Sequence, residues 1–217
     1  MPTPPYRSIR ALYTPTTVTV YQAYSPAIAS AALDAQTFVP PFKRGRATWI
    51  KPSFTWMAYR SGYARKENQE RILAVEISRA GFEWALRHAV LSHWDKTVYA
   101  TEEEWTRRKE EACVRVQWDP ERDVDINVEY RWRSLQVGLM GIAVDKYVEE
   151  WIVSITDVTD VMVRIGELVD KGEVDEARAL LPEEKVYVLP DEIARSIGMT
   201  MPQAAVEETD GDEEKKE

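Results

Sequence analysis

Residues 16–35 read TTVTVYQAYSPAIASAALDA, and this stretch combines the two patterns that decide the fold class. Residues 16–24 alternate β-branched or aromatic side chains with their neighbours at a period of two, which predicts a strand. Ser25 and Pro26 then supply an N-cap and a first helical residue for an alanine-rich helix that ends near Ala35. Short links of this kind and half-polar strands favour an antiparallel or mixed sheet over a doubly wound parallel one.

Strands and helices continue to alternate beyond this stretch. Period-two patterns predict strands at residues 47–51, 71–78, 114–118, 130–139 and 151–159, and helical spacing predicts helices at 80–94, 101–111, 140–150, 160–171 and 173–181. Asp119 and Pro120 form a turn signal that is expected to end the strand at 114–118. The sequence therefore predicts an α+β fold, a mixed or mainly antiparallel sheet with flanking helices, in a single globular domain of residues 1–199. Residues 200–217 contain seven acidic residues and few apolar ones, which predicts a disordered acidic tail.

The 217-residue chain is 44% hydrophobic and 30% charged, an ordinary composition for a globular protein. No apolar run approaches the length that spans a bilayer, and the first ten residues do not resemble a secretory signal. The single cysteine, Cys113, excludes an internal disulfide framework and fits a reducing compartment. We therefore expect no membrane partner and a cytoplasmic location, with the nucleus left open.

The net charge of −9 is distributed unevenly along the chain. Residues 1–66 contain nine Lys and Arg against one acidic residue, whereas residues 67–217 contain nineteen basic and thirty-six acidic residues. A basic segment of this kind can mark a site for phosphate or nucleic acid. A solvated surface of mixed sign would give the same counts, so the charge alone leaves both interpretations open.

Common catalytic and cofactor signatures are absent from the sequence. It contains no GxGxxG, GxxxxGK[ST], HExxH, GxSxG or paired CxxC motif. The two histidines, His88 and His93, are five residues apart on a predicted helix, a spacing that does not bring two ligands to one face. We expect no metal, and the cofactor is unknown, with NAD or another nucleotide as the candidates.

The stretch RATWIKPSFTWMAYRSG, residues 46–62, is dense in cations and aromatic rings. Arg46, Lys51 and Arg60 suit the phosphates of a ligand, and Trp49, which shares a strand face with Lys51, suits stacking on a base. The alternative is an aromatic core segment whose cations reach the surface. Because a purely buried Trp would not share its strand face with a Lys, we interpret the stretch as ligand-binding.

Two later segments extend this candidate site. In VRVQWDPER, Arg115 and Gln117 share the strand face opposite the apolar residues, so they are expected to point away from the core. Glu121 of the same segment is the best available group for acid–base chemistry. In YRWRSLQVGL, Arg133 lies on an alternating strand that is either a solvent face or a second anion-binding wall.

These segments together resemble the domain-of-unknown-function family 4291. The matching words, between Ile9 and Pro190, are IRALY, TVTVYQAY, RATWIKPSFTWMAYRSG, QERILAVEI, VRVQWDPERD, RSLQVGL, EWIVSITDVT and LPEEKVYVLP. Two positions depart from the family pattern: Ala47 stands where Met is usual, and Tyr63 where Trp is usual. Both are apolar or aromatic positions, so the two departures affect packing more than chemistry. The resemblance implies membership of the family and implies no activity.

A fainter similarity is to the ADP-ribosyltransferase superfamily, in the order and texture of the strands. The resemblance implies that Tyr21 and Gln22 lie on the first strand of such a site and Thr48 to Ser53 on the second. The sequence departs from it at the late strand, where Gln136 stands at the place of a required Glu. An analogy of this kind does not by itself carry a function.

We therefore expect a protein that handles a nucleotide or nucleic acid, and as one form of this an ADP-ribosyltransferase-like enzyme. Glu121 and Gln22 are the candidate catalytic residues. The candidate ligand-binding residues are Arg46, Trp49, Lys51, Arg60, Arg115, Gln117 and Arg133. The alternatives are a non-catalytic module that binds an anionic ligand or partner, and a structural protein whose arginines are paired with acids.

Overall fold

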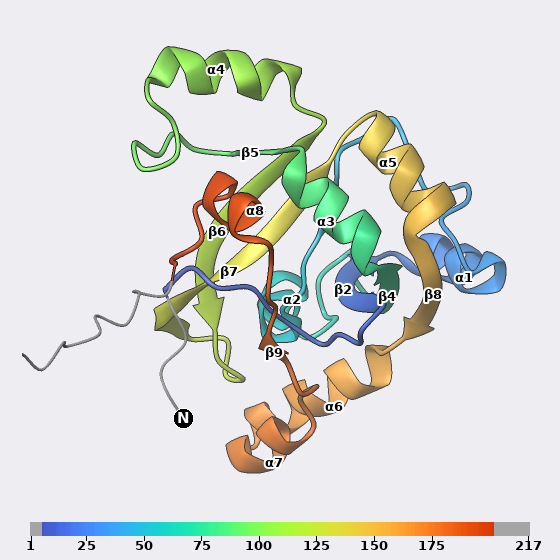
Figure 1. Cartoon of the computed structure of the whole chain (residues 1–217). Helices are drawn as coiled ribbons and strands as arrows, with labels where there is room; N and C mark the ends of the chain where they lie inside the picture. Colours follow the sequence, from blue (N-terminus) through green and yellow to red (C-terminus); the bar gives the residue numbers. More distant parts are fainter. Residues whose placement is uncertain (1–5, 202–217) are drawn as a thin grey trace, which may run out of the picture.

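The strand expected at residues 16–24 is β2 (Thr17–Tyr24), and it pairs antiparallel along its whole length with β4 (Arg71–Ser78). On its other side β4 pairs antiparallel with β8 (Ile152–Asp157), which completes a three-stranded sheet in the order β2-β4-β8. The computed structural model describes residues 6–201 (Figure 1).

A second sheet contains four strands in the order β3-β7-β6-β5. Its members are β3 (Thr48–Ile50), β7 (Val128–Leu139), β6 (Val114–Arg122) and β5 (Ala89–Leu91). Only the short β5–β6 pair is parallel within this sheet. The two sheets meet at an isolated bridge, where the Tyr21 N–H donates to the Lys51 carbonyl at 2.7 Å. The expected α+β fold with a mixed, mainly antiparallel sheet is confirmed.

Helices surround the sheets, with α4 at one end of the molecule and α6 and α7 together at the opposite end (Figure 1). The helices are α1 (Pro26–Ala35), α2 (Phe54–Ser61), α3 (Arg79–Arg87), α4 (Glu102–Glu111), α5 (Ile142–Lys146), α6 (Thr159–Asp170), α7 (Val174–Ala179) and α8 (Asp191–Ser196). The π-helical turn η1 (Tyr147–Trp151) follows α5, and a further short pair joins β1 (Arg10–Ala11) to β9 (Lys185–Val186). Within residues 6–201, no helix is long and apolar enough to cross a bilayer.

Two apolar clusters hold these elements together. The larger one fills the space between the inner faces of the two sheets and receives Phe82 of α3 and Tyr147 of η1. The smaller one covers the outer face of the three-stranded sheet, where Tyr21 and Ile72 pack against helices α2, α6 and α7. Helix α2 therefore lies between the smaller core on one side and the four-stranded sheet on the other, where it contacts β6.

The position of α2 is fixed at both ends by local sequence. Ser53 accepts a hydrogen bond from the Trp56 N–H through its side chain, as an N-cap does. Gly62, at φ 60°, ends the helix in the left-handed region that only glycine enters at little cost. Residues 51–53, which join β3 to α2 and begin with Lys51, therefore lead directly into a capped helix.

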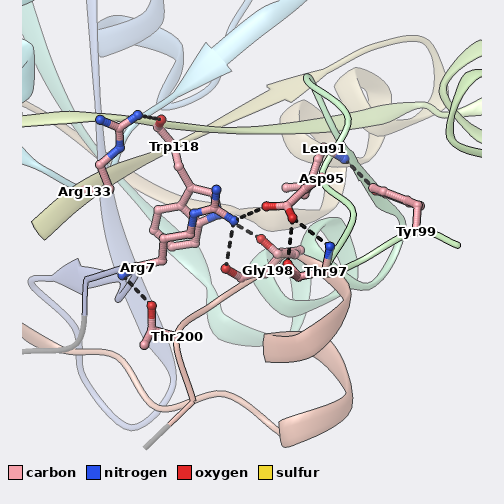
Figure 2. Close-up of polar contacts among 10 residues, drawn as sticks. Arg7, Leu91, Asp95, Thr97, Tyr99, Trp118, Arg133, Gly198 and Thr200 are labelled. Carbon is pink, nitrogen blue, oxygen red and sulfur yellow. Dashed lines mark hydrogen bonds and ion pairs between the residues drawn. The ribbon is translucent and has the colours of Figure 1, made fainter. Parts of the chain in front are cut away.

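The two ends of the described chain are tied to each other (Figure 2). The Arg7 N–H donates to Thr200 Oγ1 at 3.0 Å, and the Thr200 N–H donates to the Arg7 carbonyl at 2.9 Å. The Arg7 guanidinium also donates to Asp95 at 2.6 Å and to the Gly198 carbonyl at 3.3 Å. Thr200, the first residue of the tail expected at 200–217, therefore contacts the folded part, whereas residues 202–217 of that tail lie outside the described residues.

Two boundaries differ from the expected ones. The helix expected at 80–94 ends at Arg87, and Ala89–Leu91 instead form β5 beside β6. The strand expected to stop at Asp119 continues to Arg122. Two features explain why a proline is tolerated at position 120. On the β5 side of β6, β5 pairs only with Val114–Val116, so no strand of the described chain lies beside Pro120 there. On the β7 side, the pairing register shifts directly after Pro120.

Candidate functional site

A pocket of about 820 Å³ opens at the junction of the two sheets. Its walls come from the end of β2, the loop at residues 41–47, strand β3 and helix α2, and its floor includes residues of β6 and β7. Six of the nine candidate site residues line it, namely Gln22, Arg46, Trp49, Lys51, Arg60 and Gln117. The segments are far apart in the sequence, so the fold itself assembles this pocket.

Strand geometry explains why polar side chains face the pocket. Residues paired across antiparallel strands lie on the same face of a sheet. Gln117 pairs with Gln136, and Trp49 pairs with Gly138, on the face opposite the buried valines of β6. A Cβ atom on Gly138 would lie 2.9 Å from the Trp49 ring, so only glycine leaves room for the indole to lie across β7.

Lys51 is the most unusual side chain of the pocket. It is 5% exposed, and its Nζ atom lies 4.6 Å from the centroid of the Trp56 ring. Burial, together with the positive charge of Arg60, lowers the pKa of Lys51 to about 7, while the negative charge of Asp119 opposes this shift. Its backbone carbonyl is held by Tyr21, so the amine is presented from a rigid strand.

Four cations surround the pocket without an acidic partner. Lys43, Arg46, Lys51 and Arg60 all line it, and none of them forms an ion pair with an acid of residues 6–201. The one carboxylate among its described lining residues is Glu67, which is exposed. Cations therefore outnumber carboxylates among the described residues that line the pocket.

Arg44 provides an internal comparison for these cations. It lies on the same loop as Arg46, but its guanidinium forms ion pairs with Glu149 and Asp145. Two arginines separated by a single glycine, Gly45, thus have different roles: one fixes the loop to the η1 region, and the other faces the pocket.

The carboxylate of Asp119 lies beside the pocket, next to two glutamines that line it. Asp119 accepts hydrogen bonds from Gln117 Nε2 at 2.8 Å and from Gln136 Nε2. Both amides thereby turn their donors towards Asp119 and leave their own oxygens as acceptors. The arrangement places an anion near Lys51 without a direct ion pair between the two residues.

Gln22 lies at the back of the pocket with its amide engaged by the protein. Its Nε2 atom donates to Tyr24 Oη at 2.8 Å and to Thr48 Oγ1 at 2.9 Å, and its Oε1 atom accepts from Tyr147 Oη at 2.7 Å. Both the nitrogen and the oxygen of the Gln22 amide therefore already have hydrogen-bonding partners within the protein. These hydrogen bonds hold Tyr24 and Thr48 at the pocket wall, and the expected catalytic role of Gln22 stays a prediction.

Three expected site residues do not line the pocket, and each has a physical reason. Arg115 shares the face of Gln117, but its guanidinium turns towards the end of α4 and donates to the Lys109 carbonyl at 3.5 Å. Arg133 pairs with Pro120, on the opposite face of the sheet, and donates to the Trp118 carbonyl at 3.1 Å, as Figure 2 shows.

Glu121 is the third of these residues. The register shift after Pro120 turns it under the N-terminus of α2, where it is 6% exposed and accepts from Ser53 Oγ at 2.9 Å. Burial raises the pKa of Glu121, and its hydrogen bonds with the Arg122 N–H and Ser53 act in the opposite direction. Its expected acid–base role in the pocket is therefore not supported by its position.

Several lining residues were not among the candidates. Lys43 belongs to the basic loop, and Tyr24 and Thr48 lie on strands that were recognised. The sequence pattern marks Gln136, which lines the pocket, only as a departure from an enzyme pattern, and it predicts Asp119, which lies beside the pocket, as a turn residue. The signal that could have found both is strand parity, because Gln136 pairs with Gln117 and Asp119 is two residues further along the same face.

The chemistry available to this pocket is that of cations, amides and aromatic rings. Within residues 6–201, no group of three or more His, Cys, Asp or Glu side chains is arranged to hold a metal ion. Cations and rings together can hold a phosphorylated ligand that carries a planar group. Lys51 adds an amine that burial makes easier to deprotonate.

Comparison with known protein families gives a match over most of the chain. A family model described as a domain of unknown function (DUF4291) matches residues 8–187. No curated protein matches the chain.

Proposed function

Since the chain belongs to the domain-of-unknown-function family DUF4291, whose description names no activity, we propose from the pocket itself that the protein binds a nucleotide. The observation that carries the proposal is the set of four cations around one pocket, Lys43, Arg46, Lys51 and Arg60, none with an acidic partner in residues 6–201. Ligand pockets range over about 300–1,000 Å³, and a volume of about 820 Å³ accommodates a nucleotide.

In the proposed complex the arginines bind the phosphates of the nucleotide and an aromatic ring binds its base. Arg46 and Arg60, which are exposed at the mouth, take the phosphates, since guanidinium groups bind phosphate oxygens in a bidentate manner. Trp49, whose ring lies close against Gly138 and lines the pocket, is the ring on which a base stacks. The amide oxygens of Gln117 and Gln136 accept hydrogen bonds from the base or the ribose.

An ADP-ribosyltransferase-like enzyme is the more specific form of this proposal, with NAD as its ligand. Its support is that Gln22, Thr48 and Gln136, which lie in the three segments marked by that resemblance, all line this one pocket. Gln136 in place of a Glu speaks against the transfer reaction, because an amide cannot take a proton as a carboxylate does. Nucleotide binding is therefore the part we propose for the protein.

A non-catalytic module for an anionic ligand or partner is the second candidate function. The observation that favours it is the scarcity of carboxylates: Glu67 is the one acid among the described lining residues, and it is exposed. A short RNA belongs to the ligands of such a module, because the same cations and rings suit a nucleic acid.

Thermal-shift screening against ATP, GTP, NAD and a short RNA tests the proposal, followed by titration calorimetry of the best ligand. Arg46→Ala is expected to weaken binding by roughly ten- to hundredfold, which corresponds to about 1.5–3 kcal/mol for a lost charge-assisted hydrogen bond. Arg87→Ala is the control, because Arg87 pairs with Glu192 and does not line the pocket, and it is expected to leave binding unchanged. The absence of any ligand, or equal losses in both variants, would contradict the proposal.

A further inference from the structure

We propose that Lys51 is a nucleophilic amine that forms an imine with the aldehyde or ketone group of an anionic substrate held in this pocket. The inference rests on the proposed function, because the cations around Lys51 would hold the anionic part of that substrate. It goes further by naming a covalent step and a chemical class of substrate, the phosphorylated carbonyl compounds.

The geometry around Lys51 is that of a reactive amine rather than a structural one. Its side chain is 5% exposed, yet it lines the pocket and has no hydrogen-bonding or acidic partner within residues 6–201. The ammonium position is defined by the Trp56 ring at 4.6 Å and by the place of Lys51 directly after strand β3, where its backbone is bridged to Tyr21. A buried lysine that only stabilised the fold would be expected to pair with a carboxylate.

The electrostatics of the pocket keep this amine partly uncharged. Burial and the nearby Arg60 lower the pKa of Lys51 to about 7, so a substantial fraction of the amine is neutral at pH 7. An exposed lysine has a neutral fraction that is on the order of a thousandfold smaller at that pH. Desolvated lysines beside a second cation are the ones that proteins use as amine nucleophiles.

The step that we propose is balanced without an added oxidant or reductant. The lone pair of Nζ attacks the carbonyl carbon, a C–N bond forms, and the electron pair of the C=O bond moves to oxygen. A proton passes from nitrogen to that oxygen to give a carbinolamine, and loss of one water molecule leaves the imine. The Asp119 carboxylate, held by Gln117 and Gln136, stabilises the positive charge of the protonated imine.

The surroundings define the class of substrate. Arg46 and Arg60 at the mouth require a phosphate or a comparable anion, and the Trp49 ring favours a planar group beside the carbonyl. Sugar phosphates and nucleotide-linked sugars with a free carbonyl group satisfy the first requirement. Pyridoxal 5′-phosphate satisfies both, and for that reason it is the probe of choice.

The experiment measures reductive labelling of the full chain with pyridoxal 5′-phosphate and borohydride at pH 7. Peptide mass spectrometry gives the labelling rate of each lysine. We expect Lys51 to be labelled at least about tenfold faster than Lys66, an exposed lysine in the turn after α2, because of its larger neutral fraction. Equal rates at Lys51 and Lys66 would overturn the inference. Lys51→Met should abolish the additional label, whereas Lys66→Met should leave it in place.

Two comparisons separate this inference from nucleotide binding itself. Arg46→Ala should slow labelling of Lys51 by pyridoxal 5′-phosphate but leave labelling by pyridoxal, which has no phosphate, unchanged. ATP should protect Lys51 from the phosphorylated probe. If Lys51 reacts equally with both probes and ATP gives no protection, the anion-binding function fails and the reactive amine stands. If ATP binds in an Arg46-dependent way while Lys51 stays unlabelled, the imine inference fails and nucleotide binding stands.

Discussion

The carboxylate of Glu184 accepts the backbone N–H of Phe54 at 2.7 Å, and this hydrogen bond joins the segment before β9 to the first turn of α2. Burial, and secondarily the negative charge of Glu121, raises the pKa of Glu184 to about 8, while the Phe54 N–H and Arg10 act in the opposite direction. The N-terminus of α2 therefore lies beside two carboxylates with raised pKa values.

The first prediction concerns Glu184→Gln. Between pH 4.5 and about 8 the folded chain holds a proton on Glu184 that the unfolded chain has released, so this group lowers the free energy of unfolding as the pH rises. Glutamine stays neutral and keeps an oxygen for the Phe54 N–H. The variant should gain melting temperature relative to the wild type as the pH is raised from 5 to 9.

Thermal denaturation at pH 5, 7 and 9 checks this prediction. Glu183→Gln is the matched control, because its exposed carboxylate pairs with Lys185 and does not contact α2. A difference between Glu184→Gln and wild type that stays constant with pH would show that Glu184 is not a buried acid.

The second prediction concerns the stability of Lys51→Met. Between about pH 7 and 10.5 the unfolded chain holds a proton that the folded chain has lost, so the cost of burying Lys51 is fully present below pH 7 and disappears near pH 10.5. Methionine fills the volume without a charge. The variant should melt at a higher temperature than the wild type at pH 6–7, and the gain should shrink towards pH 10.

Lys66→Met is the control for this change, since Lys66 is exposed and donates to the Tyr59 and Arg60 carbonyls. It should not show a pH-dependent gain. Lower stability of Lys51→Met at every pH would indicate that Lys51 supports the fold, as in the structural alternative.

A third prediction concerns the glycine beneath the Trp49 ring. In Gly138→Ala the new methyl group would lie 2.9 Å from the indole, so the ring must move from its position across β7. We expect weaker nucleotide binding by calorimetry, by roughly tenfold, because stacking on an aromatic ring contributes about 1–3 kcal/mol per base. Gly45→Ala, where no atom lies within 4 Å of the new methyl group, should bind as the wild type does. Unchanged binding in Gly138→Ala would exclude Trp49 as the stacking ring.

The fourth prediction concerns the end of the chain. A chain that ends at Met201 keeps every contact of the described residues, and its melting temperature should equal that of the full chain. A chain that ends at Met199 loses both hydrogen bonds between Arg7 and Thr200, each contributing about 0.5–1.5 kcal/mol, so it should melt several degrees lower. Equal melting temperatures for the two truncated chains would show that the Arg7–Thr200 contact does not stabilise the domain.

Local alternation was enough to predict the fold class and part of the pocket. Trp49 and Lys51 are two residues apart on one strand, so period-two geometry places them on one face, and both line the pocket. The same geometry relates Arg115 to Gln117. Period-two geometry does not determine the direction in which a long side chain extends, and the Arg115 side chain extends towards α4.

The remaining positions depend on pairing between strands, which the sequence does not contain. Arg133 lies on the far face because it pairs with Pro120, and Glu121 is buried because the register shifts directly after that proline. The local chemistry of Asp119 and Pro120 predicts a turn, yet strand pairing with β7 continues past Asp119. Gln136 becomes a neighbour of Asp119 only when β6 and β7 are aligned.

The bridge between Tyr21 and Lys51 has a mechanical consequence for the pocket. The two sheets are separate hydrogen-bonded bodies joined at this bridge, and the pocket has walls from both. A ligand that contacts both β3 and the end of β2 would connect the two sheets and restrict their motion relative to each other. Backbone amides of both sheets should therefore exchange more slowly when a ligand fills the pocket, and the largest slowing is expected at the Tyr21 amide, which forms the bridge.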